Sequence, residues 1–119
     1  NSDEAIYIQL CNQIIMGIAT SMIREGDSLP SVRRLADTIG VNMHTVNKAY
    51  SILKREGYIS LDKRRGAVIA LAADKAQQLE QMRHELKIVL ARGCCKNITR
   101  REVHDLVDEI LDEYSSAMY

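Results

Sequence analysis

The sequence predicts a mainly α fold with one small β-hairpin: a compact domain over residues 1–72, then a helical tail over residues 73–119. Three observations support this class. Apolar residues recur at helical spacing on both sides of Gly40. Two short β-prone runs flank a basic tip at residues 63–66. Two further helical patterns follow Leu71 and are separated by Gly93.

The middle of the chain predicts two short helices joined by a tight turn. Pro30 disfavours helix in the residue before it, so a helix can begin directly afterwards with Ser31 as its N-cap. Gly40 supplies the left-handed residue that ends this helix, and Asn42 caps a second helix that ends before Gly57. Such a pair with a glycine at the turn is typical of a helix-turn-helix, whose second helix commonly enters the DNA major groove.

The second of these helices carries short polar side chains on the face opposite its apolar residues. That face is expected to hold His44, Lys48, Ser51 and Arg55, flanked by Thr45 and Asn47. Groups of this kind near a helix N-terminus suit contacts to base edges and phosphates. We expect Thr45, Asn47 and His44 to approach base edges.

The residues after Gly57 predict a hairpin with a basic tip. Residues 58–62 and 67–71 are β-prone, and the tip between them reads Lys63, Arg64, Arg65 and Gly66. Directly after a helix-turn-helix, such a hairpin is a wing. Three adjacent cations at its tip favour contacts to phosphates or to a minor groove.

Charge is distributed unevenly along a chain of zero net charge. Residues 30–66 hold eight Lys and Arg against three Asp and Glu, a net charge of +5. Residues 71–119 hold seven against nine, a net charge of −2. The positive charge is therefore concentrated where DNA would bind.

The tail predicts a helical hairpin. Asp74 begins one helix, which Gly93 is expected to break, and Thr99 with Glu102 forms a capping box for the next. Apolar stripes include Leu79, Met82 and Leu86 on the first helix and Val107, Ile110, Tyr114 and Met118 on the second. A lone hairpin cannot bury both stripes. We expect the first six of these residues to form the interface of a homodimer; the alternative is that the hairpin folds back onto its own winged domain.

The three cysteines do not form a disulfide framework, and an odd count without a secretory signal indicates a reducing cytoplasm. Cys11 lies in an apolar helix and is expected in the core. Cys94 and Cys95 are expected to be a loop thiol pair without function; the alternative is a redox switch or a metal site completed by His84 or His104. The expectation is no metal, no cofactor, no membrane-spanning segment and no catalytic group. The first residue is Asn1 rather than Met, so the true N-terminus is unknown.

The ordered motifs of residues 6–71 resemble the GntR family of bacterial transcription regulators. They read Ile-Tyr-x-Gln-Leu at 6–10, Gly-Asp-x-Leu-Pro-Ser-x-Arg at 26–33, Leu-Ala at 35–36, Gly-Val-Asn at 40–42, Thr-Val-x-Lys-Ala-Tyr at 45–50 and Glu-Gly at 56–57. The resemblance implies DNA-contacting roles for Arg33, Thr45 and Gly66. The short two-helix tail is similar to the YtrA-type subfamily, since fewer than fifty residues follow the wing. Met43-His44 and the wing tip depart from the common pattern.

Together these observations predict a cytoplasmic homodimer that regulates transcription, as a repressor, by binding a palindromic operator in double-stranded DNA. The expected DNA-binding residues are Ser31, Arg33, Arg34, Asn42, His44, Thr45, Asn47, Lys48, Lys63, Arg64, Arg65 and Gly66. One alternative is a winged-helix protein-docking module, which would favour a polar or acidic reading face; another is a regulator that responds to thiol oxidation or metal through Cys94 and Cys95. No residue specifies an operator sequence, a regulated gene or a small-molecule effector.

Overall fold

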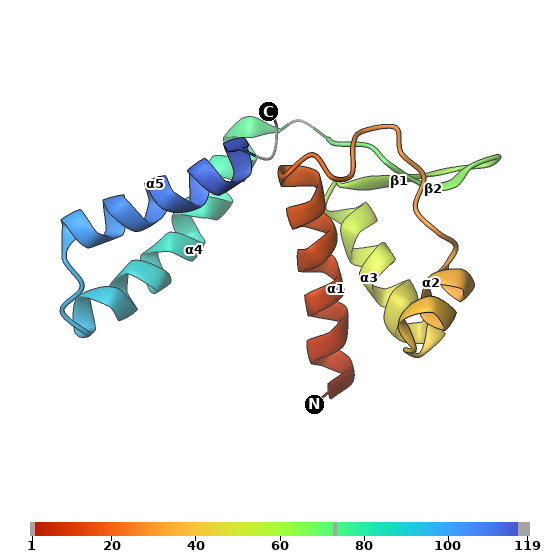
Figure 1. The fold of residues 1–119 in the computed structure, drawn as a ribbon, viewed down its shortest axis with the longest axis horizontal. Helices are drawn as coiled ribbons and strands as arrows, with labels where there is room; N and C mark the ends of the chain where they lie inside the picture. The colour runs from red at the N-terminus through yellow and green to blue at the C-terminus, as the bar shows by residue number, and fades with distance from the viewer. Residues whose placement is uncertain (1, 73, 117–119) are drawn as a thin grey trace. The chain divides into compact units, whose positions relative to one another are not determined.

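The computed structural model describes residues 2–72 and 74–116, with side chains for residues 6–72 and 74–115. The chain divides into two compact units, with the boundary in the sequence between residues 72 and 73. Each unit is described by itself below (Figure 1). Met118, expected on the apolar stripe of the tail, lies outside the described residues.

The first unit is built around a central helix. It contains α1 (Ser2–Ala19), α2 (Val32–Ile39), α3 (Met43–Arg55), β1 (Ile59–Asp62) and β2 (Gly66–Ile69). Helix α3 packs against α1, α2 and β1, and Val46, Leu53 and Ile69 are the largest side chains that are fully buried. The predicted helix-turn-helix and wing are both present, which confirms the mainly α fold with a β-hairpin.

Local hydrogen bonds explain why α2 and α3 begin and end where they do. The Ser31 hydroxyl accepts from the Arg34 N–H at 3.1 Å, and the Asn42 side-chain oxygen accepts from the His44 N–H at 2.7 Å. Gly40, at φ 72°, closes α2 in the left-handed conformation that glycine adopts without strain. These three predictions are confirmed.

Two buried polar contacts tie α3 to its neighbours. The Tyr50 hydroxyl donates to the carbonyl oxygen of Pro30 at 2.8 Å and so holds the entrance of α2 against α3; burial raises the pKa of Tyr50 to about 12. The Cys11 thiol donates to the carbonyl oxygen of Ala49 at 3.5 Å across the α1–α3 contact. Burial, and secondarily the negative charge of Glu56, raises the pKa of this thiol. Cys11 is thus a core residue, as predicted.

The wing is better braced than a two-stranded hairpin. Strands β1 and β2 pair antiparallel, from Ile59 opposite Ile69 to Asp62 opposite Gly66. On the other side of β2, Ser28 forms a bridge with Val68, and backbone hydrogen bonds join residues 26–29 to 67–69. Strand β2 therefore has partners on both edges, which compensates for the marginal stability of an isolated hairpin.

The second unit is a helical hairpin of α4 (Lys75–Cys95) and α5 (Arg100–Ser116). The side chain of Asp74 accepts from the Gln77 N–H at 3.0 Å, so Asp74 is the N-cap, as predicted. The capping box is also confirmed: Glu102 accepts from the Thr99 N–H at 2.9 Å, and Thr99 accepts from the Glu102 N–H at 3.1 Å. None of the described helices is apolar over a length that could span a membrane.

The prediction that Gly93 breaks the helix is wrong. Helix α4 continues through Gly93 to Cys95, and the left-handed residue that follows it is Asn97, at φ 64°. The Ile98 N–H donates to the Gly93 carbonyl and the Asn97 N–H to the Cys94 carbonyl, the pattern of a Schellman C-cap. A Cβ added at position 93 would make an ordinary van der Waals contact with Ile98, at 3.7 Å, so the Ile98 side chain does not require a glycine there.

Candidate nucleic-acid interface

The exposed face of α3 contains most of the side chains predicted to read DNA. His44, Asn47, Lys48, Ser51 and Arg55 are all exposed. The exposure expected for Thr45 is wrong, because its side chain is only 7% exposed. Helix α3 is covered by α1, α2 and β1, so its buried arc is wider than that of a helix packed on one side and extends past Val46 to Thr45.

The N-terminal ends of α2 and α3 present uncompensated positive charge. Neither helix has an acidic residue in its first turn, so the partial positive charge of each helix end remains available to an anion. Arg33 and Arg34 lie in the first turn of α2 with exposed side chains. Within the described part of the chain, neither forms a salt bridge. This arrangement suits a phosphate group.

Lys48 has a second role inside the protein. Its ammonium nitrogen lies 4.2 Å from the centroid of the Tyr7 ring on α1, a cation–π contact. Because both side chains keep partial exposure, the contact restrains the ammonium group at the edge of the α3 face without removing its charge from solvent. Sequence spacing placed Lys48 on the face but gave no sign of this partner.

The basic tip of the wing is organised by Asp62. Its carboxylate accepts from the Arg64 N–H at 2.8 Å and from the Arg65 N–H at 3.0 Å. These two hydrogen bonds, the one from Arg64 foremost, lower the pKa of Asp62. Gly66 completes the turn at φ 76°. The tip is therefore a defined turn that presents the exposed side chains of Lys63 and Arg64.

Arg65 differs from the other two wing cations. Its guanidinium donates through Nη2 to the carbonyl oxygen of Gly26, in the segment before α2. Arg65 therefore fastens the wing to that segment with one nitrogen and leaves its remaining N–H groups for a phosphate. The sequence predicted a cation at this position but not its role in bracing the wing.

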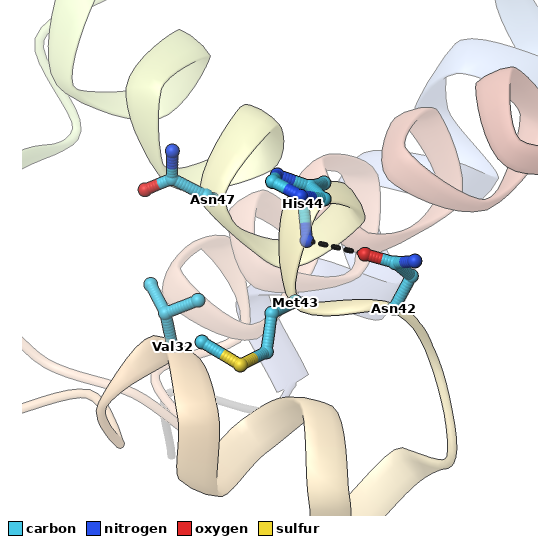
Figure 2. Close-up of a pocket in the computed structure, with 5 residues that line it drawn as sticks. All are labelled: Val32, Asn42, Met43, His44 and Asn47. Atoms are coloured by element: carbon cyan, nitrogen blue, oxygen red, sulfur yellow. Dashed lines mark hydrogen bonds between the residues drawn. The ribbon is translucent and has the colours of Figure 1, made fainter.

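A hollow of about 660 Å³ lies between α2 and α3 on the exposed face. Val32 and Met43 form its apolar part, and Asn42, His44 and Asn47 line its polar part. Figure 2 shows the Val32 and Met43 side chains directed toward one another, with Asn47 beside them. The sequence marked Met43 only as a departure from the family pattern. The position of Met43 at the start of the second helix was the available signal.

A separate surface, on the helical hairpin, consists of exposed apolar side chains. On α4, Leu79, Met82 and Leu86 line a hollow of about 390 Å³ together with Arg83, Lys87 and Leu90. On α5, Val107 is 45% and Ile110 is 38% exposed, and Tyr114 is half-buried. We call the six predicted residues Leu79, Met82, Leu86, Val107, Ile110 and Tyr114 the tail stripe.

The sequence predicted that the two adjacent cysteines lie in a loop, and this is wrong. Both lie in the last turn of α4, and both are exposed. Among the residues that the structure describes, no group of three or more His, Cys, Asp or Glu side chains is placed to hold a metal ion. The geometry thus gives no second ligand set that would join His84 or His104 to the thiols.

A reading helix with exposed polar groups, two arginines in the first turn of α2 and a braced basic wing together define a DNA-binding winged helix-turn-helix protein. Residues 6–69 match the family described as "Bacterial regulatory proteins, gntR family". The chain belongs to the GntR family of transcription regulators, which are DNA-binding proteins and not enzymes.

Its relatives include proteins of similar length. The chain is 31% identical over 112 residues to the transcriptional repressor YtrA of Bacillus subtilis, covering 92% of this chain and 86% of that protein. A YtrA structure from Sulfolobus acidocaldarius, a GntR-family transcription factor, is 38% identical with a TM-score of 0.54, covering 91% and 89%. A transcriptional antiterminator structure from Listeria monocytogenes is 33% identical with a TM-score of 0.80, covering 88% and 81%. The chain is therefore close to YtrA-type regulators.

Proposed function

We propose that this protein acts in the cytoplasm as a homodimeric repressor that binds a palindromic operator, with one winged unit on each half-site. The observation that carries the proposal is the tail stripe, whose five aliphatic side chains are exposed within a single chain although they are apolar. A second copy of the same hairpin would cover it in a four-helix arrangement. A two-fold symmetric pair of reading helices requires a two-fold symmetric DNA site.

The distribution of charge supports DNA as the ligand of the winged unit. Arg33, Arg34, Lys63 and Arg64 are exposed cations on α2 and the wing, and the adjacent helix ends add partial positive charge. We propose that these groups hold the phosphate backbone, together with the free N–H groups of Arg65. Asn47 and His44 then approach base edges, while Ser31, Asn42, Lys48 and Gly66 shape or flank the contact surface. Thr45 is buried and is omitted from the side chains proposed to read bases.

The proposal of repression is supported by the similarity to the repressor of Bacillus subtilis. Occupation of an operator that overlaps a promoter is the simplest mechanism open to a chain whose two units, as described, offer a DNA surface and a self-association surface. A protein-docking module is less well supported, because its reading surface would not need clustered cations at the start of α2 and on the wing.

Binding of selected DNA across a range of salt concentrations tests the proposal. The full chain should select a palindrome from a random duplex pool, and the logarithm of its affinity should fall with the logarithm of salt concentration with a slope of several units, about 0.9 per phosphate neutralised. Arg33→Ala should reduce that slope by about one unit for every sequence. Arg101→Ala, an exposed change on α5, is the matched control and should leave it unchanged.

Two outcomes would contradict the proposal. Selection that yields no sequence, together with a slope near zero, would favour the docking module. Selection of a single half-site without a symmetric partner would mean that the protein reads DNA but not as the proposed dimer. In a reporter strain, a rise in transcription when the protein is supplied would argue against repression.

A further inference from the structure

The hollow between α2 and α3 combines two kinds of chemistry in one place. Its apolar part comes from Val32 on α2 and Met43 on α3, and the amide of Asn47 lies at its edge (Figure 2). Met43 is 45% exposed although it is apolar, so the fold does not use it to fill the core. A single exposed methionine is ordinary. An exposed methionine beside a valine and an amide, in one hollow between α2 and α3, offers an apolar contact and hydrogen-bonding groups to the same ligand.

The base-edge groups of the major groove differ in the partner that they require. Only the C5-methyl group of thymine is apolar, and the paired N6 donor and N7 acceptor of adenine match the amide of an asparagine. Val32 and Met43 provide an apolar partner for a thymine methyl group, and Asn47 provides an amide for the N6 and N7 atoms of adenine. A cytosine at the same place would lack the methyl group, and a guanine would place its N7 and O6 acceptors against the apolar wall.

The two asparagines at the hollow are not equivalent. The side-chain oxygen of Asn42 is already the acceptor that caps α3, bonded to the His44 N–H at 2.7 Å. This bond fixes the Asn42 side chain as a cap, and its amide N–H groups remain available, which suits a phosphate. Asn47 forms no side-chain hydrogen bond among the residues that the structure describes, so both its donor and its acceptor are available. Asn47 is therefore the residue able to bind adenine through two hydrogen bonds.

We propose that this hollow recognises a thymine methyl group and that Asn47 reads an adenine one or two base pairs away. The inference rests on the proposed DNA-binding function and names the sequence chemistry of the same site. Met43 and Asn47 are four residues apart on α3, about 6 Å along the helix axis. Successive base pairs are about 3.4 Å apart. Val32 and Met43 thus act as specificity-determining residues through a contact with no hydrogen bond.

Replacement of single thymines by uracil tests the methyl contact directly, because uracil lacks only the C5-methyl group. The probe is the duplex selected by the full chain from a random pool, with each thymine of one half-site replaced in turn. One thymine should be sensitive, with affinity about fourfold weaker on the uracil duplex. Met43→Ala should lose a similar factor on the thymine duplex and should no longer distinguish thymine from uracil.

Two further variants sharpen the test. Met22→Ala is the matched control, because Met22 is 84% exposed in the loop after α1 and should retain both the affinity and the uracil effect. Asn47→Ala should weaken binding roughly 5- to 150-fold and relax the preference for adenine at one position. Both altered positions of α3 are exposed, so the fold should tolerate them, and circular dichroism would verify this.

The inference is overturned if no thymine of the selected half-site is sensitive to uracil, or if Met43→Ala still distinguishes the two bases. In either case the wild type would still bind its selected duplex, so the proposed function would stand while the role of the hollow fails. If no duplex is selected at all, the proposed function fails and the inference fails with it.

Discussion

The two units of this protein use apolar residues in opposite ways. In the winged unit, Val46 and Leu53 are 0% exposed and Ile69 is 1% exposed. In the helical hairpin, none of the side chains that the structure describes is buried, and Leu79 and Leu106 are each 55% exposed. The hairpin is nevertheless well specified locally, with an N-cap, a Schellman turn and a complete capping box. Local signals thus define its helices, while the proposed homodimer would supply the cover for its apolar side chains.

This difference predicts where a charge will be most damaging. Leu86→Glu on the tail stripe would bury a carboxylate without a partner in the proposed interface, at a cost of several kcal/mol. Dimer dissociation constants should therefore rise by about a thousandfold or more, as measured by sedimentation. Ile88→Glu is the matched control, because Ile88 is similarly exposed but lies roughly 200° around α4 from Leu86. Equal dissociation by both variants would mean that the tail stripe is not the dimer interface.

The reverse test removes volume from the buried unit. Leu53→Ala should lower the free energy of unfolding by about 2–5 kcal/mol, because the Leu53 side chain is fully buried and its removal leaves a cavity in the core. Denaturant titration would measure the loss. The control is Leu61→Ala on β1, which is 63% exposed and should change stability by less than about 0.5 kcal/mol. A similar loss in both would contradict the position of the core.

A smaller effect is expected from the capping box that begins α5. Thr99→Ala removes the hydroxyl that accepts from the Glu102 N–H, which should cost about 1 kcal/mol in thermal or denaturant unfolding. Ser115→Ala, an exposed hydroxyl loss near the other end of the same helix, should cost much less. Equal effects would show that the capping box does not contribute to the hairpin.

The smallest expected effect is a pH dependence shared by both units. The Arg64 and Arg65 N–H groups lower the pKa of Asp62 from its ordinary value of 3.8, and the Thr99 N–H and hydroxyl lower the pKa of Glu102 from 4.5. A carboxyl group whose pKa is lowered in the folded protein stabilises the fold at pH values above its ordinary pKa. This contribution is lost as the pH falls through the lowered pKa. The amide NMR signals of Arg64 and Thr99 should titrate below pH 3.8 and 4.5, respectively. Titration above those values would contradict the hydrogen bonds.

Sequence signals predicted the elements whose cause is local. Ser31, Gly40, Asn42, Asp74 and the Thr99–Glu102 pair act on neighbours within a few residues, and all of them do what their positions indicated. Gly93 misled because a single glycine is tolerated inside a helix, and α4 continues through it to Cys95. The left-handed residue that follows α4 is Asn97, a less obvious helix terminator.

The features that could not be predicted depend on distant contacts. Thr45 is buried because three elements cover α3, which helical periodicity alone does not reveal. The contacts from Arg65 to Gly26 and from Lys48 to Tyr7 each join residues about forty positions apart. The hollow at Val32 and Met43 arises only when α2 and α3 are brought together.

Sedimentation of the full chain beside a fragment ending at Ala72 tests most directly the claim that the hairpin assembles the protein. The fragment contains the whole core cluster, and circular dichroism would verify that it remains folded. The account predicts a dimer for the full chain and a folded monomer for the fragment at the same concentration. A dimeric fragment, or a monomeric full chain, would contradict it.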